Sequence, residues 1–462
     1  MRAVKVFAAV LALVVLAGAA FVAFAWEPEI APEDAAQQPE FDPAIVRQGA
    51  ELAAVGNCTS CHTVPGGKSF AGGLGIPTPF GAVYSTNITP DPETGIGRWS
   101  EAAFQRAMRE GVDREGDHLY PAFPYDHFTR VTDEDNHALY AFLMTRRPVA
   151  ATAPANDLPF PLNIRLVVAG WKLLYFDEGA YQPDSRQSDE WNRGAYLAEG
   201  LGHCGACHTP RNALGAEEAS LHFAGGMAEG WNAYAIDQSS PAPVPWDIET
   251  LAFYLRHGWH QLHGVSRGPM AEVTGNLGPL PDSDIAAIAT YVVSQMGEPS
   301  AARRQQAEAL IEQVAGGGSR PDIIQVSPAP VEGGAAESGA SVYAAACAPC
   351  HDSGRALPFG GLNFSLSAAV NAPNPQNIVN VTLFGLPAAD GEPSAVMPGF
   401  ATIMNDEQVA ELLDYMRDRF TDKPKWDGVV EMARATRTGE FNVSIRPSDG
   451  IERAPANVGA ED

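Results

Sequence analysis

The stretch Cys58-Thr-Ser-Cys-His62 decides the fold of this 462-residue chain. The same pattern, two cysteines separated by two residues and followed at once by histidine, returns at Cys204–His208 and Cys347–His351. The three copies use all six cysteines of the sequence and begin 146 and then 143 residues apart. Such a motif is typical of covalent haem attachment, in which both thiols bond to the porphyrin and the adjacent histidine binds the iron.

Zinc sites, disulfide frameworks and thioredoxin-like redox pairs also use closely spaced cysteines. Zinc requires further ligands at a second fixed spacing, and a redox pair needs no histidine after it. Three copies with no cysteine to spare therefore favour haem. The sequence predicts three haem c groups bound through Cys58, Cys61, Cys204, Cys207, Cys347 and Cys350, with His62, His208 and His351 as proximal iron ligands.

The even spacing of the motifs predicts three tandem cytochrome c-type domains of mainly α structure. A length of 462 residues suits about three domains of ordinary size. The predicted organisation is a membrane anchor or signal segment at 1–27, domains at 44–150, 188–298 and 339–421, linkers at 151–187 and 299–338, and a tail at 422–462.

The N-terminus carries Arg2 and Lys5 before an apolar run from Val6 to Trp26. This run is long enough to span a bilayer, which favours an uncleaved anchor, although Ala23-Phe24-Ala25 resembles a cleavage site. In either case the basic residues stay inside, so the rest of the chain is expected on the periplasmic side of a bacterial inner membrane. A net charge of −26 argues against a nucleic-acid partner.

The segments that follow the motifs share a helix pattern. Helices are predicted at Trp99–Gly111 and Trp246–Gly258, each with an apolar stripe and a terminal glycine, and Gly385 is the counterpart in the third repeat. A closing helix of each repeat is predicted to begin at Thr132–Asp135, Pro281–Asp284 and Asn405–Gln408, with Phe142, Tyr291 and Tyr415 facing a partner helix.

The sixth iron ligand is expected in the loop between these two helices. Met270 and Met397 each stand twelve residues after the terminal glycine, which predicts sulfur ligation of the second and third haems. In the first repeat this place is taken by Phe123, which cannot bind iron. The candidates there are His127, which is preferred, and His118, with a five-coordinate or otherwise ligated iron as the alternative.

The linkers differ in character. The apolar segment 162–176 carries Arg165 and Lys172 and is too short to span a bilayer, so we expect it to pack between domains or against a partner. The segment 299–338 begins as a polar helix and ends in a glycine- and proline-rich stretch typical of a flexible joint. No haem role is evident for the tail.

Up to about residue 420 the chain resembles the three-haem cytochrome c subunits of bacterial membrane-bound dehydrogenases. The resemblance lies in GNCTSCHT, YSTNITPDPETGIGRWS, LYPAFPY, NIRLVVAGWKLLYF, CGACHTPRNALGA, GPMAEV and MPGF. Such subunits accompany alcohol, gluconate, sorbitol and fructose dehydrogenases, and molybdenum hydroxylases that act on aldehydes or N-heterocycles. The resemblance implies haem at all three motifs and ligation by Met270 and Met397. Several members carry methionine where this chain has Phe123, so their first-haem ligand does not carry over.

The expected function is therefore electron transfer by a subunit that is not itself an enzyme. A molybdenum or flavin dehydrogenase would supply electrons, and ubiquinone, a soluble cytochrome or a terminal oxidase would accept them. Two alternatives use the same residues: a peroxidase or reductase with an open first haem, where His118, His127 or Asp126 would serve as acid–base group, and a free-standing membrane-tethered shuttle. No flavin, pterin or nicotinamide motif names a substrate.

Overall fold

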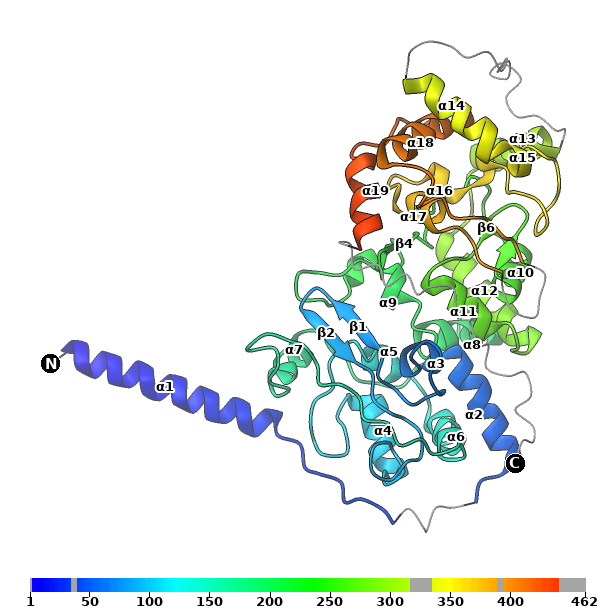
Figure 1. Ribbon diagram of the computed structural model, residues 1–462. Helices are drawn as coiled ribbons and strands as arrows, with labels where there is room; N and C mark the ends of the chain where they lie inside the picture. The colour runs from blue at the N-terminus through cyan, green and yellow to red at the C-terminus, as the bar shows by residue number, and fades with distance from the viewer. Residues whose placement is uncertain (1, 35–39, 316–334, 389–393, 440–462) are drawn as a thin grey trace. The chain divides into compact units, whose positions relative to one another are not determined.

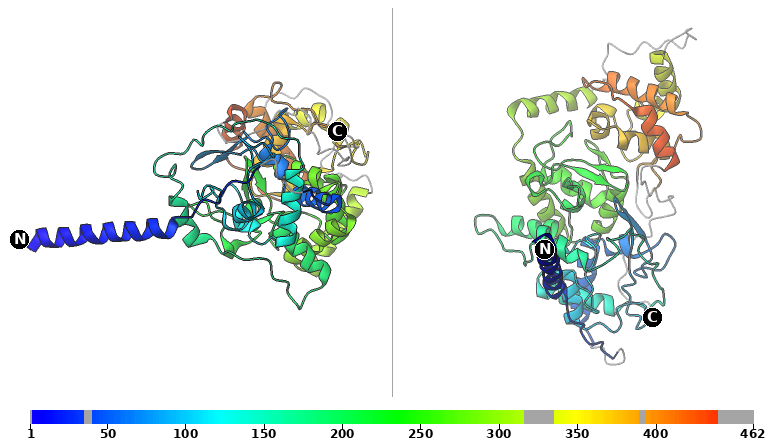
Figure 2. Two further views of the ribbon diagram at one scale, coloured as in Figure 1. Left: turned by 90° about the horizontal axis from the view of Figure 1, so that it is seen from below. Right: turned by 90° about the vertical axis from the view of Figure 1, so that its left-hand side faces the viewer.

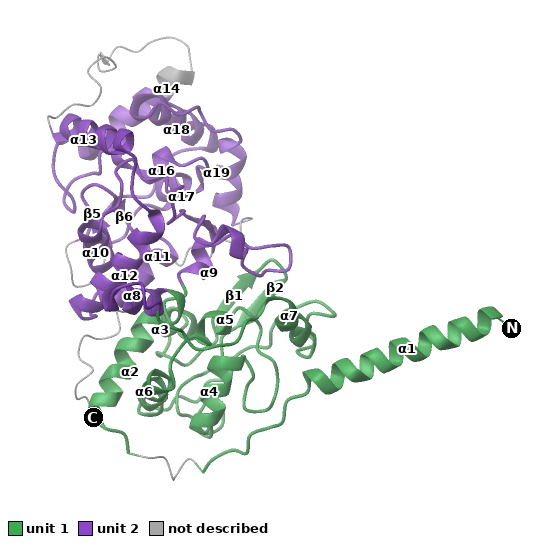
Figure 3. Ribbon diagram, turned by 180° about the vertical axis from the view of Figure 1, so that it is seen from behind, with its two compact units in different colours: residues 1–183, 199–203 green, residues 184–198, 204–462 purple. Residues whose placement is uncertain are grey.

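The computed structural model describes residues 2–34, 40–315, 335–388 and 394–439. They fall into two compact units, coloured separately in Figure 3: residues 1–183 with 199–203, and residues 184–198 with 204–462. The first unit contains the first motif, and the second unit contains the other two. The glycine-rich part of the predicted joint at 316–334 lies outside the described residues.

The first unit is helical apart from one hairpin (Figure 1). Its elements are α1 (Arg2–Ala25), α2 (Pro43–Val55), α3 (Cys58–His62), β1 (Gly75–Thr78), β2 (Gly81–Tyr84), α4 (Glu101–Glu110), α5 (Tyr125–Phe128), α6 (Asp133–Met144) and α7 (Val167–Tyr175). Strands β1 and β2 pair antiparallel, with Gly75 opposite Tyr84.

Helix α1 runs out from the rest of the first unit as a single rod (Figure 2). Its 24 residues would extend about 36 Å, enough to cross a hydrocarbon layer of about 30 Å. The helix is apolar after Arg2 and Lys5, and Ala25 is its one buried residue. Length and composition therefore make α1 a candidate membrane span.

The second unit repeats the helical plan twice. Its elements are α8 (Asp189–Glu199), α9 (Gly205–His208), the 3₁₀ turn η2 (Ala219–Leu221), β3 (Gly226–Ala228), β4 (Trp231–Ala233), α10 (Ile248–His257), β5 (Trp259–His260), β6 (Gly264–Val265), α11 (Pro269–Leu277), α12 (Asp282–Met296), α13 (Ala301–Ala315), α14 (Ala335–Ala346), α15 (Ala348–His351), the 3₁₀ turn η3 (Phe364–Leu366), α16 (Ala368–Asn371), α17 (Gln376–Phe384), α18 (Asp406–Phe420) and α19 (Val429–Thr438). The short strands pair antiparallel as β3 with β4 and β5 with β6.

In every repeat the first helix crosses the closing helix at a glycine. A side chain at these positions would meet the closing helix's backbone: Gly49 lies against Ala138, Gly194 against Ala287 and Gly339 against Glu411. A built Cβ would come within 1.9 to 2.2 Å of the facing carbonyl oxygen, so only glycine permits the crossing. The predicted aromatics flank these crossings, which confirms that they face the partner helix.

The predicted ends of the helices are confirmed. Helices α4, α10 and α17 each end at a glycine with positive φ: Gly111 at 62°, Gly258 at 73° and Gly385 at 70°. The closing helices begin where expected, after the N-caps Thr132, Pro281 and Asn405. The capping side chains of Thr132 and Asn405 accept main-chain N–H bonds, as their residue types predict.

The core of the third repeat extends into the predicted tail. Trp426, Val429 and Ala433 are buried with Leu412 and Leu413 of α18. The Trp426 indole N–H donates to the carbonyl of Ala372 at 3.0 Å, which fixes the chain between α18 and α19. Residues 422–438 are thus part of the packing of this repeat, and residues 440–462 lie outside the described residues.

Candidate haem-binding sites

The three motif histidines share one hydrogen-bonding arrangement. Each donates its Nδ1–H to a main-chain carbonyl of the loop that follows: His62 to Thr86 at 2.6 Å, His208 to Tyr234 at 2.6 Å and His351 to Leu362 at 2.8 Å. A carbonyl oxygen can only accept, so the proton sits on Nδ1 and Nε2 keeps its lone pair. Metal-binding histidines are held in this way, with one ring nitrogen anchored and the other presented to the metal.

The surroundings keep these imidazoles neutral, as iron ligation requires. Burial lowers the pKa of His62, His208 and His351, and the bond to the carbonyl only partly opposes that shift. The Phe364 ring also stacks on His351, with centroids 4.0 Å apart and planes at 22°. The histidines are therefore oriented and uncharged before any metal binds.

The cysteines of each motif lie on one short helical turn beside their histidine. In the first motif α3 contains both Cys58 and Cys61, three positions apart and hence on the same face. All six cysteines are thiols rather than disulfides. Burial raises the pKa of Cys58 to about 12, and that of Cys207 and Cys347 to about 11, so these groups are neutral thiols in the folded chain.

The Phe-Gly-Gly-like turns after the motifs bring the chain back against the haem-binding turn. The Gly72 N–H donates to the His62 carbonyl at 2.7 Å, and the Gly225 N–H does the same to His208. In the third repeat a Cβ at Gly361 would lie 2.6 Å from Nδ1 of His351. A larger residue there would displace the imidazole, which explains the glycine.

One buried histidine of the second repeat indicates a missing partner. His263 is 9% exposed and stacks on Trp246 with centroids 3.5 Å apart. Neither of its ring nitrogens has a hydrogen-bond partner among the described residues. Buried polar atoms are almost always paired in folded proteins, so a bound group that carries polar atoms fits here. Together with the thiol and imidazole sets, this agrees with haem c, which brings carboxylates with it.

The two predicted methionine ligands lie between α10 or α17 and the closing helices, Met397 in a loop as expected and Met270 in the first turn of a helix. Met270 is the second residue of α11 and is half-buried. Met397 is also half-buried and pairs through its main chain with Leu386, next to the terminal glycine of α17. The structure thus gives both methionines fixed backbone positions, and their ligation of iron stays a prediction.

The first repeat has no methionine in the corresponding loop. The ring of Phe123 lies 5.2 Å from that of Phe128, in edge-to-face contact. Met108 is buried in α4 and Met144 is buried at the end of α6, both in the helical core. The loop therefore offers no sulfur to the first haem.

Both nitrogens of His118 are already used. Nε2 donates to the carbonyl of Ala25 at 2.8 Å, and Nδ1 faces the ammonium of Lys172 at 3.0 Å. Since Nε2 carries the proton, Nδ1 is the acceptor of the Lys172 bond. The lone pair that would bind iron is engaged, which argues against His118 as a ligand.

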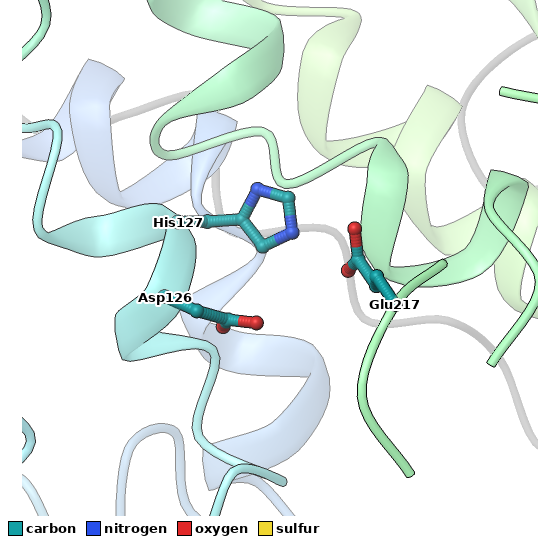
Figure 4. Close-up of side chains that lie close together, drawn as sticks. All are labelled: Asp126, His127 and Glu217. Atoms are coloured by element: carbon teal, nitrogen blue, oxygen red, sulfur yellow. The ribbon is translucent and has the colours of Figure 1, made fainter. Parts of the chain in front are cut away.

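His127 has the arrangement of the motif histidines. It projects from α5 (Figure 4), is 5% exposed, and its Nδ1–H donates to the carbonyl of Glu199 at 2.9 Å. A ring nitrogen of His127 also lies within 4.8 Å of a carboxylate oxygen of Asp126, the preceding residue. The two hydrogen bonds of His118 argue against that histidine, and ligation of iron by His127 stays a prediction.

The carbonyls that orient the motif histidines were not predicted from sequence. Thr86, Tyr234 and Leu362 follow their histidines by 24, 26 and 11 residues. Their side chains have nothing in common, because only the main-chain oxygen acts. With neither a fixed spacing nor a residue type, no sequence signal could have identified them.

The helical repeats, the Cys-x-x-Cys-His turns and the anchored imidazoles define a c-type cytochrome. Residues 46–147 match the family model described as cytochrome c, and residues 334–416 match that of cytochrome c oxidase, cbb3-type, subunit III.

Among curated proteins, the chain is 37% identical over 435 residues to the gluconate 2-dehydrogenase cytochrome c subunit of Pantoea cypripedii, covering 90% of this chain and 92% of that protein. It is 37% identical to the fructose dehydrogenase cytochrome subunit of Gluconobacter japonicus, over 82% and 79% of the two chains. It is 44% identical over 419 residues to a nicotinate dehydrogenase subunit of Pseudomonas putida, covering 90% of this chain but only 34% of that longer protein. The chain belongs to the family of cytochrome c subunits of dehydrogenases, whose members transfer electrons.

Proposed function

We propose that this chain binds three haem c groups and transfers electrons from a separate dehydrogenase subunit to an acceptor in or near the membrane. The observation that carries the proposal is the arrangement found three times: a Cys-x-x-Cys-His turn whose histidine is locked through Nδ1 to a carbonyl. Bound haem c supplies one-electron chemistry through the ferrous and ferric states of its iron.

The protein's own contribution is to hold each iron in a fixed ligand set. Met270 and Met397 are the proposed sixth ligands of the second and third haems. Methionine raises the reduction potential and fills the coordination site, so these two sites would carry electrons without binding substrate. This supports a carrier rather than an enzyme.

For the first haem we propose His127 as the sixth ligand, because His118 is committed to Ala25 and Lys172. A bis-histidine haem has a lower potential than a His/Met haem. The first haem would then be the lowest-potential member, which suits the entry or the quinone-facing end of the chain.

The proposed electron donor is a molybdenum or flavin dehydrogenase, and the proposed acceptor is ubiquinone, a soluble cytochrome or a terminal oxidase. The relatives support a dehydrogenase partner, since they are named as subunits of gluconate, fructose and nicotinate dehydrogenases. Helix α1, long and apolar enough to cross a membrane, supports an anchor. Arg2 and Lys5 before its apolar run are the reason to propose that the haem-bearing part lies on the periplasmic side of a bacterial inner membrane.

The test is to purify the chain after co-expression with a haem c maturation system and to measure haem per polypeptide, the stepwise redox titration and cyanide binding. We expect three haems by mass, two high potentials and one lower potential, and no prompt cyanide binding. The Cys347→Ser/Cys350→Ser variant should retain two haems. Two haems in the unaltered chain would contradict the stoichiometry, and cyanide binding to one third of the haem would favour an enzyme with an open first site.

His127→Ala separates the ligand hypotheses at the first haem. If His127 binds iron, the variant exposes one haem to cyanide and carbon monoxide, whereas an unchanged spectrum and potential would exclude this ligand. His137→Ala is the matched control, because that histidine pairs with Glu101 at the surface of the same unit.

A further inference from the structure

Helix α7 exposes apolar side chains and half-buries its lysine, the reverse of what is usual for a helix in contact with water. Its Leu173 and Leu174 are 68% and 66% exposed, while Lys172 between Trp171 and these leucines is half-buried. Just before the helix, Phe160 is 79% exposed. Soluble proteins rarely expose such neighbouring apolar side chains unless they meet another apolar phase.

The two cationic side chains of this segment point to the protein instead. The Lys172 ammonium donates to the Gly111 carbonyl at 2.8 Å, and a second bond goes to the carbonyl of Glu110. Arg165 donates to the carbonyl of His118 at 3.2 Å. The two charges are thus satisfied internally, and Leu173 and Leu174 are left exposed at the end of α7.

The segment lies beside the end of the candidate membrane helix. A Cβ built at Gly170 would lie 3.7 Å from the ring of Phe21, which is the half-buried residue in an otherwise exposed stretch of α1. Figures 1 and 2 show α7 next to the end of α1 that joins the rest of the first unit. Trp26, directly after α1, is 66% exposed. Tryptophan is favoured where the hydrocarbon layer meets the headgroups.

A hydrogen-bonded bridge through His118 connects α7 to the last residue of α1. His118 accepts from Lys172 of α7 through Nδ1 and donates to Ala25, the last residue of α1, through Nε2. The imidazole of His118 therefore links α7 to the end of α1. If α1 spans the bilayer, α7 is held at its outer boundary.

We propose that the segment 159–176 is a second membrane contact, lying in the plane of the outer lipid boundary with Phe160, Leu173 and Leu174 among the acyl chains. The occupant of this apolar face is the lipid bilayer itself. The inference rests on the proposed span by α1. Its geometry is that of an interfacial helix, whose apolar side enters the lipid by about 5–10 Å. The haem-bearing part of the first unit would thereby be held close to the membrane in one orientation.

The experiment attaches a polarity-sensitive dye to the full chain with its haems in place. The six native cysteines all belong to the motifs, so Leu174→Cys adds the one thiol intended for the dye. Leu214→Cys is the matched control, an equally apolar residue that is 53% exposed in the second unit. Val10→Cys, within α1, reports whether the span itself enters the bilayer.

The labelled proteins are reconstituted into vesicles of phosphatidylethanolamine and phosphatidylglycerol, with lipids brominated near the headgroup end of the acyl chain as quenchers. We expect a blue shift at position 174 and at least twofold stronger quenching than at position 214. A lipid-like signal at position 10 with a water-like signal at 174 would overturn the interfacial helix and leave the anchor standing. Water-like signals at both positions would overturn both. Unchanged haem spectra show that the variants are folded.

Discussion

The side chain of Asn377 forms two hydrogen bonds with the main chain of Asn232. Its Oδ1 accepts from the Asn232 N–H at 2.8 Å, and its Nδ2 donates to the Asn232 carbonyl at 2.9 Å. Asn377 belongs to α17 of the third repeat, and Asn232 belongs to β4 of the second. The amide therefore pairs with the open edge of the β3–β4 hairpin as a neighbouring strand would. Asn380 adds a bond to the carbonyl of Gly230 at 3.0 Å.

Asn377→Ala should loosen the two repeats of the second unit. Two net hydrogen bonds are worth about 1–3 kcal/mol, so the free energy of unfolding should fall by that amount. Hydrogen exchange at the Asn232 amide should accelerate. Gln306→Ala, at an exposed position on α13, is the control and should change neither quantity. Unaltered exchange at Asn232 in the Asn377 variant would show that the bond is not formed in solution.

Met270→Leu and Met397→Leu should each leave the sixth coordination position of one haem iron without its protein ligand. Leucine keeps nearly the same volume but has no sulfur, so packing is preserved while the proposed ligand is lost. We expect loss of the far-red absorption of ferric His/Met haem, cyanide binding to one third of the haem, and a fall in one potential on the order of 0.1 V, within the roughly 0.8 V range set by axial ligands. Met227→Leu, 55% exposed, is the control. A variant that kept all three spectra would exclude its methionine as a ligand.

Local chemistry explains what could be predicted from the sequence. The helix that begins after Ser100 has a capping hydroxyl and a terminal glycine, and both signals act within a few residues. The same holds for the start of α18, where the two residues of the capping box, Asn405 and Gln408, are only three positions apart. Each of these helix-end signals is weak alone, but the same signal at the matching position of another repeat makes the prediction stronger.

Relations between distant segments could not be predicted. The sequence of 162–176 shows an apolar run with two cations, but it does not say which side faces outward. That depends on acceptors supplied by Glu110 and Gly111, about sixty residues earlier. The packing of the tail could not be predicted either, since the burial of Trp426 depends on the carbonyl of Ala372, 54 residues away. Such contacts follow from tertiary packing and leave no periodic pattern.

His118 should make the first unit sensitive to acid. Burial, aided by the charge of Lys172, lowers the pKa of His118, although the bond to Ala25 opposes this shift. Below the ordinary histidine pKa of about 6.5 the unfolded chain therefore binds more protons than the folded chain, and stability falls as the pH falls. The melting temperature of the unaltered protein should decline below about pH 6.5, and this decline should be shallower in His118→Gln.

The same variant tests whether His118 binds iron. Its haem spectrum and potentials should match those of the unaltered protein, because both imidazole nitrogens serve Ala25 and Lys172. A changed first-haem spectrum in His118→Gln would place this histidine on the iron. His137→Gln, which removes an exposed pairing with Glu101, controls for the loss of a histidine as such.

His263→Phe should shift the potential of one haem without affecting haem attachment. His263 is held against Trp246, and burial lowers its pKa to about 3, so the ring is neutral. Its two nitrogens have no partner among the described residues, and an unpaired buried polar group costs about 1–3 kcal/mol. A carboxylate brought by the bound haem would remove that cost by accepting one N–H.

Phenylalanine at position 263 preserves the stacking but removes the donor, which leaves the carboxylate more negative and favours the ferric state. One potential should therefore fall, by less than roughly 50 mV, because a net hydrogen bond of about 1 kcal/mol is present in both oxidation states and only its change between them shifts the potential. His137→Phe should leave all three potentials in place, and three unchanged potentials in His263→Phe would show that this histidine does not contact a haem.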